Sequence, residues 1–168
     1  MQFKINTLLS LLAIPALANA ACQLSNGLGP GPHAPETRGQ LCKPQGVGDW
    51  TFAMRTSELV VPTFDSDYMW EGYISGKNFI IYDHACVPRG KYSIGDDCGI
   101  EYVIMENFLP YVLTVTSVNW STGSPYFNFK YGNGRFMIGE NQATCQNIGG
   151  GLRVEMGCKT GFPQDGTV

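Results

Sequence analysis

The sequence has little of several features that mark common classes of protein. It contains only two histidines, charged residues make up 15% of the chain, and the basic residues never form a run of three. Scattered basic residues give no basic face that could release counterions from phosphates, so we expect no nucleic-acid partner. After the first twenty residues, no apolar stretch is long enough to span a bilayer, and we expect no membrane span.

Closely spaced cysteine pairs are also missing. The chain has six cysteines, but no Cys-x-x-Cys pair of the kind that marks zinc sites and thioredoxin-type redox centres. We therefore expect no metal and no cofactor. Helical periodicity is absent as well, because Gly or Pro interrupts nearly every window of twelve residues after the first twenty.

The first twenty residues have the features of a secretory signal peptide. Lys4 provides the positive n-region, residues 8–17 form a short apolar run, and Ala18-Asn19-Ala20 matches the small-x-small cleavage pattern. Cleavage after Ala20 predicts a secreted, extracellular protein. Because Lys4 is the only charged residue of the leader, the net charge of -3 for the whole chain becomes about -4 after cleavage.

An even number of cysteines in an oxidising pathway favours three disulfides. The cysteines concerned are Cys22, Cys42, Cys86, Cys98, Cys145 and Cys158. Six cysteines permit about fifteen connectivities, and we favour sequential pairing, each short loop then contributing about 3 kcal/mol in the chain-entropy model. The expected bridges are Cys22–Cys42, Cys86–Cys98 and Cys145–Cys158.

The mature chain divides into two parts by composition. Residues 21–49 are dense in Gly and Pro and predict an irregular arm, which contains His33. Residues 50–168 predict a single β-rich domain, because short β-branched and aromatic runs are punctuated by turn residues at intervals of eight to twelve.

The β-rich part predicts an all-β fold, an antiparallel β-sandwich or barrel of about eight to nine short strands stapled by disulfides. The expected strands are residues 50–54, 58–61, 68–74, 78–84, 100–106, 111–120, 126–131, 135–138 and 152–156. Turns are expected at Gly76-Lys77, at Gly132-Asn133-Gly134 and at Gly149-Gly150-Gly151.

For two expected strands, the sequence pattern does not show which face points toward the core. Both faces of the run 111–120 carry apolar residues near one end, so alternation does not identify the inner face. In the run 126–131, Tyr126 falls on one face and three aromatics fall on the other, which predicts that one of its two faces is exposed.

Asn119-Trp120-Ser121 is the only N-glycosylation sequon after the leader, and it lies at an expected strand end. We predict glycosylation of Asn119, with the unmodified side chain as the alternative. Acidic residues near 65–67 and 96–97 lack the spaced ligands of a calcium loop, so we interpret them as turn formers.

Three residues are the best candidates for catalysis if the protein is an enzyme: His84, Arg89 and Glu101. Small secreted fungal ribonucleases resemble this composition and use a carboxylate, a histidine and an arginine on one β face for general acid-base chemistry. A second proton carrier would have to be His33, in the distant arm, and no segment matches their motifs residue by residue. Our first expectation is therefore a protein without catalytic residues.

The opening Met1-Gln2-Phe3, the Ala18-Asn19-Ala20 cleavage pattern and the six cysteines carry a resemblance to small cysteine-rich secreted proteins of filamentous fungi. Several of those proteins act as effectors or elicitors on plant hosts. The resemblance implies a non-enzymatic monomer that acts on a host extracellular or cell-surface protein and modulates defence, cell death and virulence. The alternatives are a lectin-like module that binds cell-wall carbohydrate through exposed aromatics, and a small ribonuclease-like hydrolase.

Overall fold

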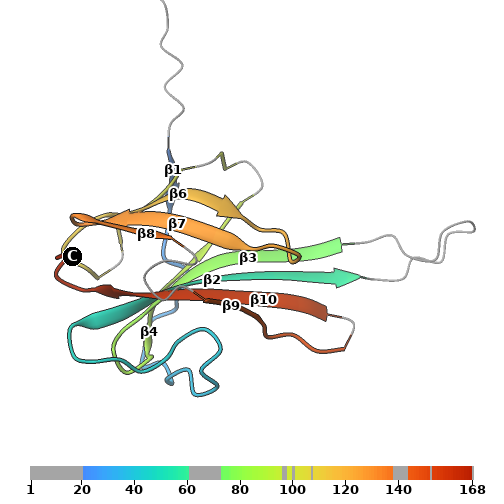
Figure 1. Cartoon of the computed structure of the whole chain (residues 1–168), viewed down its shortest axis with the longest axis horizontal. Coiled ribbons are helices and arrows are strands. Elements are labelled where there is room, and N and C mark those ends of the chain that lie inside the picture. Colours follow the sequence, from blue (N-terminus) through green and yellow to red (C-terminus); the bar gives the residue numbers. More distant parts are fainter. Residues whose placement is uncertain are drawn as a thin grey trace, which may run out of the picture.

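The computed structural model describes residues 21–60, 73–95, 98–99, 101–106, 108–137, 144–151 and 153–167. Residues 1–20, which were predicted to be a leader, lie outside these residues. The described residues form ten strands and no helix, arranged as two five-stranded sheets (Figure 1). None of them forms a helix with the length and apolar character that crossing a membrane requires. The all-β, sandwich-like fold is thus confirmed.

The first sheet has the strand order β1-β5-β6-β7-β8. Its strands are β1 (Cys22–Leu24), β5 (Tyr102–Ile104), β6 (Leu113–Asn119), β7 (Tyr126–Tyr131) and β8 (Gly134–Met137). Strand β1 is parallel to β5, and the other neighbours are antiparallel. The start of the arm is therefore part of the sheet.

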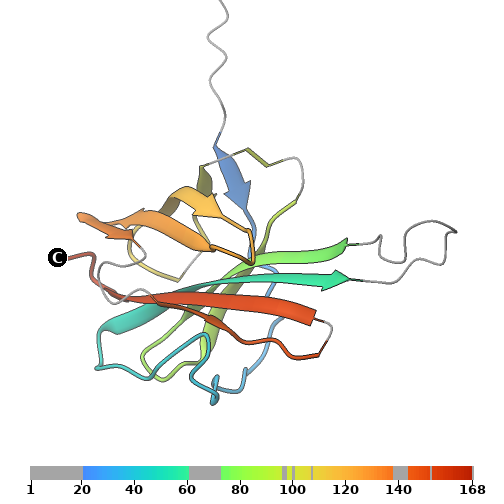
Figure 2. The ribbon, with the colours of Figure 1, turned by 45° about the vertical axis from the view of Figure 1, so that its right-hand side comes forward.

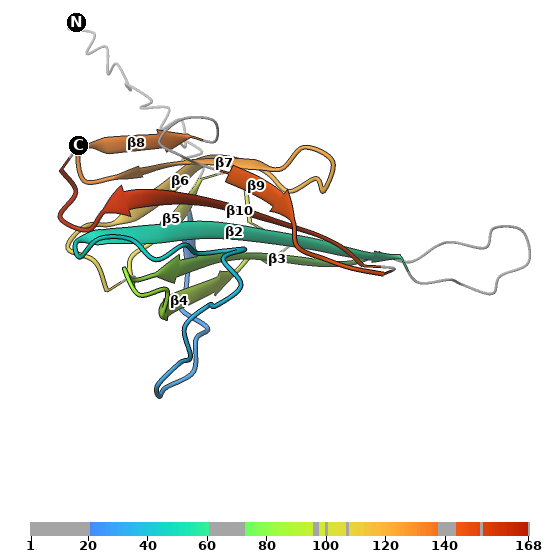
Figure 3. The same ribbon diagram turned by 60° about the horizontal axis from the view of Figure 1, so that its bottom comes forward.

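The second sheet has the strand order β4-β3-β2-β10-β9, and all its neighbours are antiparallel. Its strands are β2 (Asp49–Val60), β3 (Tyr73–Tyr82), β4 (Pro88–Ser93), β9 (Thr144–Asn147) and β10 (Arg153–Pro163). Figure 3 shows β2, β3 and β10 continuing to one side beyond the strands of the first sheet.

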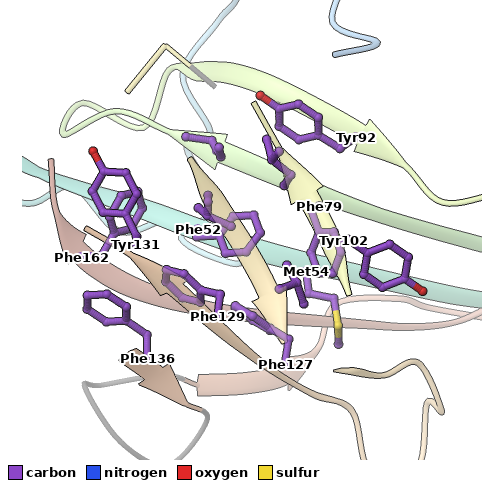
Figure 4. Packing of buried hydrophobic residues seen from close by; sticks show 14 of the residues in the cluster. Phe52, Met54, Phe79, Tyr92, Tyr102, Phe127, Phe129, Tyr131, Phe136 and Phe162 are labelled. Atoms are coloured by element: carbon purple, nitrogen blue, oxygen red, sulfur yellow. The ribbon is translucent and has the colours of Figure 1, made fainter. Parts of the chain in front are cut away.

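Aromatic side chains fill the space between the two sheets (Figure 4). Phe52 of β2 lies within 5.3 Å, between ring centroids, of Phe79 and Phe127, and 4.9 Å from Phe129. Edge-to-face and tilted ring pairs of this kind add to the free energy of burying their apolar area. This core shows which face of β7 points inward. The three aromatics on its inner face are buried, whereas Tyr126 on the other face is 41% exposed. The prediction of one exposed face is confirmed.

A smaller apolar cluster lies on the outer face of the second sheet. It is formed by Leu41, Cys42, Ala53, Ile80, Tyr82 and Cys86. The arm supplies Leu41 and Cys42, so this Gly- and Pro-rich segment covers the sheet and contributes to a core. Figure 2 shows the later part of the arm, coloured light blue to cyan, on the side of the second sheet that faces away from the first, whereas β1 at its start lies with the first sheet.

Glycines on β10 let the arm lie close to the sheet. A Cβ atom added at Gly157 would come within 2.7 Å of Leu41 Cδ2, and one at Gly161 within 2.7 Å of Gln45 Oε1. The Lys159 ammonium, between these glycines in sequence, donates hydrogen bonds to the carbonyl oxygens of Gly39 and Gln40. Burial lowers the pKa of this ammonium group.

Several strand boundaries differ from the prediction. The expected strands 50–54 and 58–61 belong to one strand, β2, which includes the described residues of both runs. Residues 73–74 and 78–82 belong to β3, whereas residues 68–72 of the expected strand 68–74 lie outside the described residues. The expected turn at Gly76-Lys77 is wrong, because both residues lie inside β3, paired with Ser57 and Thr56. A Cβ atom at Gly76 would lie 2.8 Å from Ser57 Oγ, so this glycine marks a close approach between strands.

Two of the three expected disulfide pairings are wrong. The bridges are Cys22–Cys98, Cys42–Cys86 and Cys145–Cys158, of which only the last was predicted. The parallel pairing of β1 with β5 sets Cys22 opposite Tyr102, close in sequence to Cys98. A hydrogen bond from Glu36 N to Cys86 O, 2.9 Å long, holds the later part of the arm against the β3–β4 turn, where Cys42 meets Cys86.

Candidate functional site

A cleft of about 480 Å³ lies between the arm and the sandwich. Four separate segments form it, namely the arm, the start of β2, the start of β4 and the connection from β5 to β6. The described residues that line it are Asn26, Leu28, Gly29, Pro30, Gly31, His33, Trp50, Pro88, Arg89 and Phe108. Its size lies within the range that is usual for sites of small ligands. We refer to it as the arm cleft.

The arm forms one wall of the cleft and is fastened to strand β4. Asn26 Oδ1 accepts hydrogen bonds from Leu28 N at 3.0 Å and from Lys91 N at 3.1 Å. Gly27 N donates to Lys91 O at 2.7 Å. One asparagine side chain thus shapes the arm locally and attaches it to the edge of the sheet, as expected of a residue that hydrogen-bonds nearby backbone.

His33 lies on the same wall and is half-buried. Its Nε2 lies 2.9 Å from Gly29 O. Because a carbonyl oxygen only accepts hydrogen bonds, Nε2 must carry the hydrogen and donate it. The other ring nitrogen, Nδ1, has no partner among the described residues and remains available to a ligand.

Phe108 lies on the connection between β5 and β6, lines the cleft, and is 68% exposed as a residue. Its φ of 59° lies in the left-handed region, which is unfavourable for a bulky residue. The connection is held near β4 by the buried hydroxyl of Tyr92, which donates to Glu106 O at 2.6 Å. Strained backbone positions cluster at functional sites, and here the strained residue also adds an exposed apolar side chain to the lining of a cleft.

Arg89 provides the positive charge of the cleft and is oriented by Asp83. Its Nε and Nη2 donate to Asp83 Oδ2 at 3.0 and 2.8 Å. Asp83 is buried and also accepts from Ala85 N and Val87 N through Oδ1. Burial by itself would raise the pKa of this carboxyl, but the hydrogen bonds from Val87, Arg89 and Ala85 outweigh burial and lower its pKa.

Both ends of the arm are attached covalently. Cys22–Cys98 anchors its beginning and Cys42–Cys86 its later part, so the wall that carries Asn26 and His33 lies between two disulfides. Glu36 organises the segment before Cys42, since its carboxylate accepts from the backbone N–H groups of Arg38, Leu41 and Cys42. A wall fixed at both ends is preorganised for binding.

The arm cleft can bind a ligand that has an apolar body and a polar edge. Phe108 supplies an exposed ring, the prolines of the arm and of β4 extend the apolar lining, and Trp50, which is only 8% exposed, adds a small part of its largely buried side chain. Arg89, His33 and Asn26 supply the polar atoms. An apolar pocket with a few convergent polar groups is the usual composition of a small-molecule site.

The three candidate catalytic residues do not all line this cleft. Arg89 does, whereas His84 is exposed on the β3–β4 turn and Glu101 is exposed just before β5. The backbone of His84 accepts a hydrogen bond from Gln45 N, and that of Glu101 accepts one from Cys22 N. The histidine that lines the cleft together with Arg89 is His33. From the sequence, His33 was expected to lie far from Arg89, because His33 lies in the arm.

The remaining sequence candidates can be placed in part. Asn119, at the end of β6, accepts a hydrogen bond from Ser121 N at 3.1 Å and donates to Ser124 O at 2.9 Å. Its glycosylation stays a prediction. The acidic residues at 65–67 and 96–97 lie outside the described residues. Among the residues that the structure describes, no three His, Cys, Asp or Glu side chains are grouped to hold a metal ion.

Sequence reasoning did not assign the aromatic residues of the cleft to a site. Trp50 was interpreted as the start of a strand and as one of many aromatics expected mostly in the core, and Phe108 fell between two expected strands. The sequence gives no local signal for either role, because the cleft is assembled by long-range pairing and by disulfides. Comparison with known families, curated proteins and solved structures found no match, so the functional argument depends on this geometry alone.

Proposed function

We propose that this protein is a secreted effector that acts on host plant cells by binding a host component in the arm cleft, and not by catalysis. The observation that carries the proposal is the exposed ring of Phe108, held on left-handed backbone over a cleft whose opposite wall is fixed by two disulfides. A preformed apolar site with an exposed aromatic residue is suited to recognition.

The contacts of the candidate catalytic residues also support binding. Arg89 is committed to Asp83 through two hydrogen bonds, and no described hydrogen bond or ion pair joins its side chain to that of His84 or Glu101. General acid-base catalysis needs its groups within hydrogen-bond reach of one reacting atom. Recognition needs only that the cleft remain complementary to a ligand.

Infiltration of the purified secreted protein into leaves tests this proposal. Ion leakage and defence-gene expression are measured for the wild type, for Phe108→Ala and for the matched surface variant Tyr126→Ala, whose ring is 41% exposed on β7. We expect a response to the wild type and to Tyr126→Ala, and at least a fivefold weaker response to Phe108→Ala. Circular dichroism and thermal unfolding verify that each variant folds.

The enzymatic alternative makes the opposite prediction. If the protein were a hydrolase, His84→Ala or Glu101→Ala would abolish the response while Phe108→Ala would leave it intact. That result, together with RNA cleavage by the wild type, would overturn the proposal. No response to the wild type in any susceptible plant would also overturn it.

Carbohydrate binding is the second candidate, and one observation favours it. The exposed ring of Phe108 lies on the same cleft as the polar side chains of Asn26 and Arg89, and sugars commonly stack on aromatic rings while bonding to such groups. Pull-down with chitin and with β-glucan measures this function. Retention of the wild type but not of Phe108→Ala would favour a lectin-like role.

A further inference from the structure

The arm cleft differs in charge from the rest of the chain. The whole sequence has a formal net charge of -3, yet the described lining of the cleft contains Arg89 and His33 and no Asp or Glu. The carboxylate nearest to this charge is Asp83, which lies behind Arg89 and is buried. Arg89 is thus the one formally charged side chain of the described lining, and the exposed end of its guanidinium is complementary to a ligand that carries negative charge.

The geometry of Arg89 limits what kind of anion fits. A guanidinium has five N–H donors in a planar fork, and Asp83 takes only the edge formed by Nε and Nη2. The end formed by Nη1 and Nη2 remains for a second acceptor. A carboxylate matches that planar pair of donors. Because Asp83 already offsets the charge of the guanidinium, a phosphate dianion would leave more uncompensated negative charge in the cleft than a carboxylate would.

The apolar part of the lining defines the rest of the ligand. Phe108 presents an exposed aromatic surface, Leu28, Pro30 and Pro88 extend the apolar wall, and Trp50 contributes the small exposed part of a largely buried ring. Flat rings pack well against such surfaces, and about 480 Å³ accommodates one ring or two fused rings. The unpartnered Nδ1 of His33 can meet a polar substituent at the edge of a ring.

We propose that the arm cleft binds a small planar aromatic carboxylate, with its carboxylate on the free end of the Arg89 guanidinium and its ring against the exposed side chain of Phe108. This inference rests on the proposed binding function of the cleft and names the class of ligand. It adds a chemical role for Asp83, which holds the guanidinium in place without lining the cleft itself.

Calorimetric titration of the purified secreted protein tests the ligand class. The probes are 2-naphthoate, its neutral isostere 2-naphthamide and the dianion 2-naphthyl phosphate. We expect 2-naphthoate to bind with a Kd at least tenfold lower than either of the others. Phe108→Ala should weaken binding of 2-naphthoate about fivefold, whereas Tyr126→Ala should leave it unchanged.

Removing Arg89 alone would leave Asp83 buried without its partner, so the charge test uses the double variant Asp83→Asn with Arg89→Gln. This variant should bind 2-naphthoate at least tenfold more weakly while its affinity for 2-naphthamide stays the same. Binding of both compounds with equal affinity, tighter binding of the phosphate, or no binding of 2-naphthoate would each overturn the inference.

The titration and the leaf assay fail independently. If 2-naphthoate does not bind but the leaf response still depends on Phe108, the ligand class is wrong and the binding function stands. If 2-naphthoate binds in the cleft but Phe108→Ala elicits a full response, the ligand class stands and the proposed function of the cleft is wrong.

Discussion

At the scale of single residues, Asp83 organises the turn between β3 and β4. Its two oxygens accept four hydrogen bonds, two from backbone N–H groups at 2.9 Å and two from the Arg89 guanidinium. The carboxylate is therefore well satisfied despite its burial. We predict that Asp83→Asn destabilises the protein by about 2–3 kcal/mol, because an amide cannot accept all of these bonds and leaves Arg89 without its ion pair.

The same residue gives a prediction of pH dependence. Since the folded-state pKa of Asp83 is lowered, its contribution is fully present above the ordinary Asp pKa of about 4 and is lost as the pH falls toward the lower folded value. Urea unfolding at neutral pH and between pH 5 and 2 measures both effects. The difference between wild type and Asp83→Asn should shrink in acid, whereas Asp49→Asn, at an exposed carboxylate, should behave as wild type. A difference that does not change with pH would contradict this assignment.

At the scale of elements, strand β6 shows why alternation failed to identify an inner face. Its pairing with β7 shifts between Val115 and Ser117. Before this irregularity Leu113 and Val115 are buried in the core, and after it Val118 and Trp120 pack against the same core. One β-bulge therefore exchanges the odd and even positions, and both faces of the sequence pattern are apolar for that reason.

Trp120, just after β6, carries a testable consequence of this arrangement. Its ring lies 4.9 Å from that of Phe79, but its buried Nε1 has no hydrogen-bond partner among the described residues. We predict that Trp120→Phe costs about 1 kcal/mol or less, because the lost contacts are offset by removing an unsatisfied N–H group. Trp120→Ala should cost about 2–4 kcal/mol. Chemical denaturation measures both free energies of unfolding. Equal destabilisation by the two substitutions would show that the unsatisfied N–H group does not reduce stability.

The strength of the local pattern decided which elements the sequence could predict. Strand β7 was predicted with its observed bounds, because aromatic residues alternate in it and Gly132 supplies a turn with a φ of 54°. Strands β1, β4 and β9 were missed, since they are short or contain Pro, Gly and polar residues, and their pairing depends on neighbours distant in sequence.

At the scale of the whole molecule, the position of the arm is the feature that the local sequence pattern predicted least well. Its Gly and Pro content correctly excluded a helix, and most of its residues lie outside strands. What composition could not show is that parallel pairing and two long-range disulfides place the arm on the sandwich. The candidate site follows from that placement, which is why the sequence named Arg89 and His33 without predicting that they line one cleft with Trp50 and Phe108.

The later anchor of the arm gives the last prediction. The Cys42–Cys86 bridge closes a sequence separation of 44 residues and contributes about 4 kcal/mol in the chain-entropy model. Replacing both cysteines by Ala should lower stability by about that amount and leave the outer cluster around Leu41 weakly held. Limited trypsin digestion should then cut after the exposed Arg38 at least tenfold faster than in the wild type, because local opening controls access.

The matched control for this prediction replaces Cys145 and Cys158, whose bridge spans 13 residues between the neighbouring strands β9 and β10. That variant should lose about 3 kcal/mol in the same model and become less stable overall, but cleavage after Arg38 should not become faster under conditions where it remains folded. Mass spectrometry of the fragments identifies the site of cutting. Equal acceleration in both variants would mean that the arm opens only with global unfolding, so that the wall of the cleft would be as stable as the sandwich itself.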